Sequence, residues 1–155
     1  MRFELCAVSA FAVGLISGPA AAESLGGIAV GELMTDARAE LAKNGQVKES
    51  LVGGSLVLVA GDFIVTSCKD RVWGVTRSLD PTFSAFVTTS KLLEGQTGKR
   101  PTVDIVQDDG KEVMRGIEFK WAMPDGTTIA TTYFDGRSGG SVTQAVRRTA
   151  LCPSS

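Results

Sequence analysis

The chain has 155 residues and contains no histidine. A serine hydrolase of the triad type needs an imidazole to take the proton from its nucleophile, and histidine is also the commonest nitrogen ligand of protein-bound metals. The stretch Gly136-Arg137-Ser138-Gly139-Gly140 fits the Gly-x-Ser-x-Gly pattern of a nucleophile elbow. Because the residues after Ser138 are typical of a strand and not of a helix, we interpret this stretch as a hairpin turn.

Two catalytic arrangements remain possible without histidine. One is a serine-lysine pair at Ser138, for which the spacing selects none of the candidate bases Lys43, Lys48, Lys69, Lys91, Lys99, Lys111 and Lys120. The other is a pair of carboxylates, since Asp and Glu together number 17. We keep a small hydrolase as an alternative, but we predict that the chain is not an enzyme and needs no cofactor.

Motifs for phosphate and for metal ions are also incomplete. Gly98-Lys99 resembles part of a phosphate-binding loop, but such a loop needs glycine and Ser or Thr where this chain has Leu93 and Arg100. The acidic turn Asp108-Asp109-Gly110 lacks both the preceding carboxylates and the closing glutamate of a calcium loop. We therefore predict no metal site.

The longest apolar run lies at the start of the chain, from Leu5 to Ile16. Arg2 precedes it and Ala20-Ala21-Ala22 follows it, which is the layout of a secretory signal peptide of bacterial style. The run is too short to span a bilayer as a stable helix. We predict that residues 1–22 are cleaved and that the product, residues 23–155, is periplasmic or secreted and has no membrane span.

Cysteine is scarce, with three in the chain. Removal of the signal peptide would take Cys6 and leave Cys68 and Cys152, an even count in an oxidising compartment. We predict a disulfide between them. On the chain-entropy view, a loop of this size stabilises the fold by about 4 to 5 kcal/mol.

The formal net charge is only −1, which argues against a nucleic-acid partner. Several basic residues fall in predicted loops or in the last predicted strand: Lys99, Arg100, Arg137, Arg147 and Arg148. If they gather at one end of a sheet, they can meet an acidic protein partner in the cell envelope. The alternative is scattered charge that keeps the surface hydrated.

The first half of the chain predicts one helix and three antiparallel strands. Thr35 is placed to cap a helix over Asp36–Asn44, with Gly45 as its stop. The strands are expected in the runs 51–60, 62–68 and 71–79. In the second of them Phe63, Val65 and Ser67 share one face.

The second half predicts a helix followed by four strands joined by hairpins. Asp80-Pro81 predicts a helix from Pro81 to Glu94, and the residues of one face recur at helical spacing: Phe83, Phe86, Val87, Ser90 and Leu93. The strands are expected over 102–106, 112–123, 127–134 and 141–152, separated by glycine-containing turns. In the longest strand Ile117, Phe119 and Trp121 share the core face, and Arg115 interrupts the apolar row.

These elements give the order α-βββ-α-ββββ. We predict a single two-layer α+β domain over residues 23–155, with an antiparallel sheet, helices packed on one face and one disulfide. The repeated order of helix and meander suggests two structurally related halves. Trp73 and Trp121 lie in apolar rows, so we expect both in the core.

A short resemblance begins near the first helix. Gly31-Glu32-Leu33-Met34-Thr35, followed by Ala39 and Leu41, resembles the opening helix of small secreted domains such as β-lactamase-inhibitor-like proteins and outer-membrane assembly accessories. It covers about a tenth of the chain. Those families place a second helix before their strands, which this chain does not show, so no residue role is carried over.

The first functional hypothesis is a non-enzymatic binding or accessory module that acts through a protein partner. The alternative to it is a carrier of a small apolar ligand, with Phe83, Phe86 and Phe119 around a pocket between the helix 81–94 and the sheet. An apolar cavity under that helix would favour the carrier. An exposed apolar patch rimmed by arginines would favour the protein partner.

Overall fold

The computed structural model describes residues 24–109, 113–136 and 139–152. The predicted signal peptide, Arg137 and Ser138 therefore lie outside the described residues. The helices are α1 (Met34–Leu41) and α2 (Phe83–Thr97), with short 3₁₀ turns at Ala42–Asn44 and Thr149–Leu151. The strands are β1 (Ser24–Leu25), β2 (Ile28–Ala29), β3 (Lys48–Val52), β4 (Ser55–Ala60), β5 (Phe63–Cys68), β6 (Arg71–Leu79), β7 (Thr102–Asp109), β8 (Val113–Ala122), β9 (Thr127–Asp135) and β10 (Ser141–Arg148). The prediction of an α+β chain with an antiparallel sheet is confirmed.

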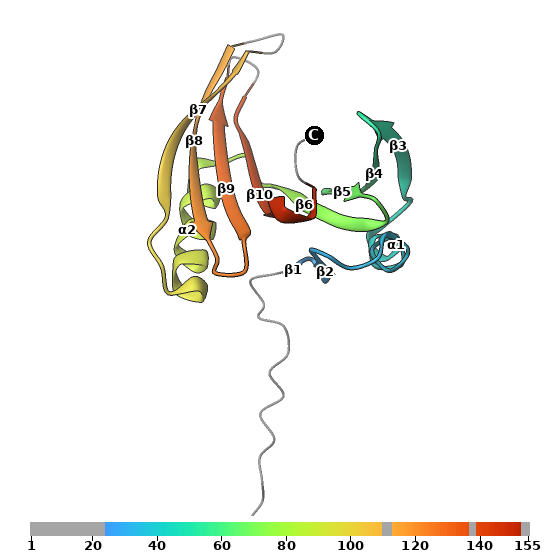
Figure 1. The fold of residues 1–155 in the computed structure, drawn as a ribbon. Helices are drawn as coiled ribbons and strands as arrows, with labels where there is room; N and C mark the ends of the chain where they lie inside the picture. Colours follow the sequence, from blue (N-terminus) through green and yellow to red (C-terminus); the bar gives the residue numbers. More distant parts are fainter. Residues whose placement is uncertain (1–23, 110–112, 137–138, 153–155) are drawn as a thin grey trace, which may run out of the picture.

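One antiparallel sheet of eight strands has the order β3-β4-β5-β6-β10-β9-β8-β7, while β1 and β2 form a separate hairpin. Each half of the large sheet is a four-stranded meander that follows one helix. The last strands of the two halves, β6 and β10, pair in the middle, where Val146 lies opposite Val75. Figure 1 shows the sheet strongly curved, with the edge strands β3 and β7 on opposite sides of the view.

The first meander has four strands, so the prediction of three is wrong. The run 51–60 is a hairpin, because Gly53 and Gly54 turn the chain between β3 and β4 with φ values of 58° and 82°. Two consecutive residues with positive φ form the tight turn that matches the twist of paired strands. The β1–β2 hairpin, which was not predicted, has the same chemistry at Gly26 and Gly27.

The helix starts also differ from the predictions. α1 begins at Met34 and includes Thr35, because the backbone N–H of Met34 donates to the carbonyl of Asp70 and fixes the entry to the helix. In α2 the cap is Thr82, whose Oγ1 accepts a hydrogen bond of 3.1 Å from the N–H of Ala85. α2 then continues three residues beyond the predicted end and stops at Gly98 in the left-handed conformation.

The core is built on one face of the large sheet. Cross-strand pairing aligns one buried residue from each of six neighbouring strands: Leu58, Val65, Val75, Val146, Ile129 and Trp121. Residues of both helices belong to the same buried cluster, among them Ala37 of α1 and Leu93 of α2. The predicted alternation in β5 and the core position of Trp121 are confirmed. Trp73, which was also expected in the core, is only half-buried and does not belong to the core cluster.

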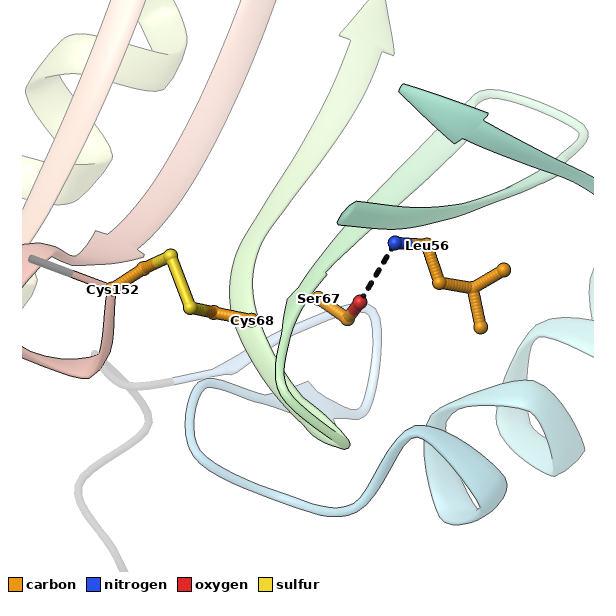
Figure 2. Close-up of a disulfide and its surroundings, with 4 residues drawn as sticks. All are labelled: Leu56, Ser67, Cys68 and Cys152. Carbon is orange, nitrogen blue, oxygen red and sulfur yellow. Dashed lines mark hydrogen bonds between the residues drawn. A yellow bond between two sulfur atoms is a disulfide. The ribbon is translucent and has the colours of Figure 1, made fainter. Parts of the chain in front are cut away.

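The predicted disulfide between Cys68 and Cys152 is present, with a Cα–Cα distance of 5.5 Å (Figure 2). It joins the end of β5 to the residue after the C-terminal 3₁₀ turn. Beside it the β5–β6 register shifts between Thr66 and Ser67, and Ser67 Oγ accepts a hydrogen bond of 3.0 Å from the N–H of Leu56. Neither α1 nor α2 is long and apolar enough to cross a membrane.

Candidate functional site: the cavity between α2 and β8

A cavity of about 340 Å³ lies between α2 and the sheet. Its walls are Phe83, Phe86, Val87, Ser90, Lys91 and Glu94 of α2, Pro101, and Ile117, Phe119 and Trp121 of β8. The α2 residues recur every three or four positions and so share one helix face, and the β8 residues alternate and so share one sheet face. Because α2 packs chiefly on β9 and β10, the face of β8 is left open beside the helix.

Aromatic rings form most of the apolar wall. The rings of Phe86 and Phe119 lie 4.9 Å apart between centroids, and Phe119 meets Trp121 edge-on at 6.4 Å. Phe83 packs on Phe86 at 5.7 Å and edge-on against Tyr133 of β9 at 5.4 Å. Tilted and edge-to-face pairs at these distances are favourable. The wall is therefore a set of mutually supported rings.

Trp121 is also held by its polar edge. Its Nε1 donates a hydrogen bond of 3.1 Å to the carbonyl oxygen of Lys99, in the loop after α2. Lys99 Nζ donates in turn to the carbonyl of Ala122 at 2.9 Å. These two bonds tie the loop to the end of β8, so Lys99 has a structural role beside the cavity.

The lining contains few polar groups. Ser90 is only 5% exposed, and its Oγ has no hydrogen-bond partner among the residues that the structure describes. Lys91 and Glu94 carry opposite charges and are exposed. The lining therefore has one buried polar atom without a partner and no buried charge.

The apolar surface continues from the cavity to the edge of the sheet. On the edge strand β7, Val103 lies opposite Phe119 and Ile105 lies opposite Ile117, so both share the face of the lining residues. Val103 is 58% exposed and Ile105 is 85% exposed. Phe83, at the start of α2, is 53% exposed. An apolar strip therefore leads from solvent into the cavity.

The three residues predicted for a ligand pocket, Phe83, Phe86 and Phe119, lie together in this lining. Trp121 is predicted for the core but not for the pocket. The alternation in β8 could have placed Trp121 in the pocket. Ile117 lies two residues before Phe119 and Trp121 two residues after it, so all three share one face of the strand. The sequence pattern predicts Ser90 only as a member of the buried helix face.

The predicted basic residues that the structure describes differ in their surroundings. Arg147 is exposed and, opposite Gly74, lies on the sheet face away from the cavity. Arg100 is exposed in the loop before β7. Arg148 is engaged by Asp125 and by Thr127, whose Oγ1 accepts from its Nε at 3.1 Å. Whether any of these residues meets a partner stays a prediction.

Asp125, which forms the ion pair with Arg148, is also held by Thr127. The Thr127 hydroxyl donates to its carboxylate at 2.6 Å, and the Thr127 backbone N–H donates at 3.0 Å. These hydrogen bonds, the hydroxyl first, together with the guanidinium of Arg148, lower the pKa of Asp125. The cluster fixes the turn between β8 and β9.

Among the candidate catalytic groups that the structure describes, two carboxylates and one lysine lie together, since Asp104 of β7 is opposite Glu118 of β8 and both contact Lys120. Lys120 forms ion pairs of 2.8 Å with Asp104 and with Glu118, and the hydrogen bonds that its ammonium group donates to these two carboxylates raise its pKa. Lys43 pairs with Glu40. Ser138 and Lys111 lie outside the described residues. In the part of the chain that the structure describes, no group of three or more acidic or cysteine side chains is arranged to hold a metal ion.

A second cavity, of about 370 Å³, lies at the start of α1 and is lined by Leu33, Met34, Thr35, Arg38, Leu56 and Asp70. It contains no aromatic ring, and its Arg38 forms an ion pair with Glu49 of β3. The cavity beside α2 is therefore the better candidate for binding an apolar molecule.

No protein-family model matches the chain, and neither the curated proteins nor the solved structures include a significant match to it.

Proposed function

We propose that this chain is a non-enzymatic binding module whose ligand is a small, largely apolar molecule held between α2 and β8. The observation that carries the proposal is the lining of the cavity, with four aromatic rings around about 340 Å³. Ligand sites in proteins are typically concave and mostly apolar, with volumes of about 300 to 1,000 Å³. The cavity lies at the lower end of this range, so a small ligand fits it.

The apolar strip beside the cavity supports the same proposal. Exposed aromatic and branched side chains such as Phe83 and Ile105 are unfavourable in water, and a bound apolar molecule would cover part of this surface. The mutual packing of Phe86, Phe119 and Trp121 holds the wall in place before the ligand arrives. A preformed site loses less conformational entropy on binding.

We also propose that the module works outside the cytoplasm. The disulfide between Cys68 and Cys152 is typical of oxidising compartments. The apolar segment at the start of the sequence supports the same location, because its flanking residues match an export signal. Both features fit a periplasmic or secreted carrier.

A protein partner in the cell envelope is the second candidate function. The observation that favours it is the exposure of apolar residues on both edge strands, Leu51 and Val52 on β3 and Val103 and Ile105 on β7. Unpaired sheet edges with exposed apolar residues are typical sites for another chain. Arg100 and Arg147 are exposed and could contribute charge to such an interface.

A cavity-filling substitution separates these functions. Val87 lines the cavity and is half-buried, so Val87→Trp should fill the space that a ligand needs. Leu92→Trp is the matched control, because Leu92 lies on the same helix, is 61% exposed and does not line the cavity. Binding is measured with residues 23–155 by fluorescence titration with 1-aminoanthracene, and circular dichroism checks that each variant folds.

We expect saturable binding to the wild-type chain and to Leu92→Trp, and binding at least tenfold weaker to Val87→Trp. Absence of saturable binding to the wild-type chain, or equal binding to both tryptophan variants, would contradict the carrier proposal. A specific cross-linked envelope protein that is lost in Arg100→Ala/Arg147→Ala and kept in Val87→Trp would favour the second candidate.

A further inference from the structure

The lining of the cavity contains one feature that an apolar carrier does not require. Ser90 lies in the middle of α2, is nine-tenths buried and faces the cavity with a hydroxyl that has no partner among the described residues. A serine in a helix can return its hydroxyl to the carbonyl four residues earlier, which here belongs to Phe86. That bond is not formed.

The hydroxyl of Ser90 both donates and accepts hydrogen bonds. A hydrocarbon in the cavity would exclude water from this group and leave it unpaired, which is unfavourable. A ligand with one hydroxyl or carbonyl group at its buried end would pair with it. Sites that offer a buried hydrogen-bonding group discriminate strongly against ligands that lack the matching group.

The charges of the lining favour a neutral ligand. Lys91 and Glu94 are opposite in sign and exposed, so together they add little net charge at the rim. The buried part of the lining holds no ionised side chain that could compensate a charge on the ligand. Moving an ion into such a site without a counter-charge is costly.

The shape of the wall favours a ring. Phe86, Phe119 and Trp121 present flat surfaces inclined to one another by 55° and 74° in successive pairs. A planar ligand can stack on one of these rings and meet the next by its edge. From these features we infer that the ligand is a neutral, ring-containing molecule with one hydroxyl or carbonyl group, which hydrogen-bonds to Ser90. The inference rests on the proposed function.

The test compares naphthalene with 2-naphthol at neutral pH, where both are uncharged. Affinities are measured for residues 23–155 from amide chemical-shift titrations. The wild-type chain is expected to prefer 2-naphthol by about tenfold, the effect of one hydrogen bond of average strength. Ser90→Ala is expected to remove this preference, and alanine is a better helix former than serine, so the helix is retained.

Thr131→Val is the control. Thr131 Oγ1 is also buried without a partner among the described residues, but Thr131 does not line the cavity. The preference for 2-naphthol should survive this substitution. A third probe, 2-naphthoate, tests the charge and should bind more weakly than 2-naphthol.

The outcomes separate the two proposals. Equal affinity of the wild-type chain for naphthalene and 2-naphthol, or a preference that persists in Ser90→Ala, overturns the inference about Ser90 and leaves the carrier in place. Tighter binding of 2-naphthoate than of 2-naphthol overturns the inference of a neutral ligand. If none of the three probes binds to the wild-type chain, the proposed function itself fails.

Discussion

The indole Nε1 of Trp121 donates a hydrogen bond to the carbonyl oxygen of Lys99, 3.1 Å away. Trp121 is almost fully buried, and the loop that carries Lys99 follows α2 directly. One contact therefore orients a wall of the cavity and holds the chain between the helix and β7.

Replacement of Trp121 by phenylalanine tests this contact. The smaller ring keeps an aromatic surface but cannot donate to Lys99, so we expect the free energy of unfolding to fall by about 1 to 3 kcal/mol. Trp73→Phe is the control, because Trp73 Nε1 is buried without a partner among the described residues. Urea denaturation should show a smaller loss for Trp73→Phe, and equal losses would contradict the role given to the hydrogen bond.

Gly116 provides a test of close packing in the sheet. A Cβ at this position would lie 2.3 Å from the carbonyl oxygen of Tyr133 and 2.8 Å from the ring of Phe134. Gly116→Ala is expected to destabilise the fold by about 1 to 3 kcal/mol, because neither the backbone nor the packed ring can move away freely. Thermal unfolding measures the change.

Gly95→Ala is the opposite case. Gly95 lies within α2, and a Cβ there would meet nothing within 4 Å. Alanine should stabilise the helix by about 0.5 to 1 kcal/mol. A Gly116→Ala variant that unfolds at or above the wild-type temperature, as Gly95→Ala is expected to do, would contradict the close approach at Gly116.

The disulfide should contribute a large share of the stability. Cys68 and Cys152 are separated by 84 residues, and closing a loop of this size restricts the unfolded chain by about 4 to 5 kcal/mol on the entropy model. We expect Cys68→Ala/Cys152→Ala to unfold at a much lower temperature than the oxidised wild-type chain. Dithiothreitol should lower the unfolding temperature of the wild-type chain and leave that of the double variant unchanged.

Asp125 should contribute to stability in a pH-dependent way. Its pKa is lowered below the ordinary value of 3.8, so its contribution is complete above that pH and is lost as the pH falls through the lower pKa of the folded state. Asp125→Asn should therefore lower the unfolding temperature at neutral pH. The difference from wild type should shrink below pH 3.8, and a difference independent of pH would contradict this assignment.

Ionisation of Glu32 should change the stability of the fold in the opposite direction to ionisation of Asp125. Burial raises its pKa above the ordinary value of 4.5, and the negative charges of Asp36 and Glu40 add to this effect. The ionised form is disfavoured in the folded chain, so the stability falls as the pH rises from 4.5 through the higher pKa of the folded state. Glu32→Gln is expected to stabilise the chain at neutral pH and to have less effect at acidic pH, as measured by thermal unfolding.

Local signals in the sequence explain which elements could be predicted. The four strands of the second meander are predicted because turn residues such as Asp125-Gly126 separate clear alternating patterns. Their ends are predicted less well, since β10 stops at Arg148, before a 3₁₀ turn, and not at residue 152. The prediction for the first meander is wrong because the glycine pair at 53–54 forms a turn that divides one predicted strand into two. The start of α1 depends on the hydrogen bond from Met34 to Asp70, a residue far along the chain, so local capping rules could not place it.

In the candidate site, too, some residues follow from local sequence patterns and others depend on contacts between distant segments. The helical spacing of Phe83 and Phe86 and the alternation around Phe119 were sufficient to place these residues between a helix and a sheet. The unpaired hydroxyl of Ser90 and the orientation of Trp121 follow from contacts between distant segments. They depend on how far α2 leaves β8 uncovered, which no local pattern encodes.

The pairing of β6 with β10 has a consequence for how the chain folds. Each meander ends in the strand that its counterpart must pair with, so neither half can complete its sheet alone. The chain passes from the first meander to α2 and the second meander through the segment Asp80–Thr82, and the disulfide is a second covalent link between the halves. Two polypeptides divided at this segment should each be incomplete in isolation and should assemble with one another when mixed.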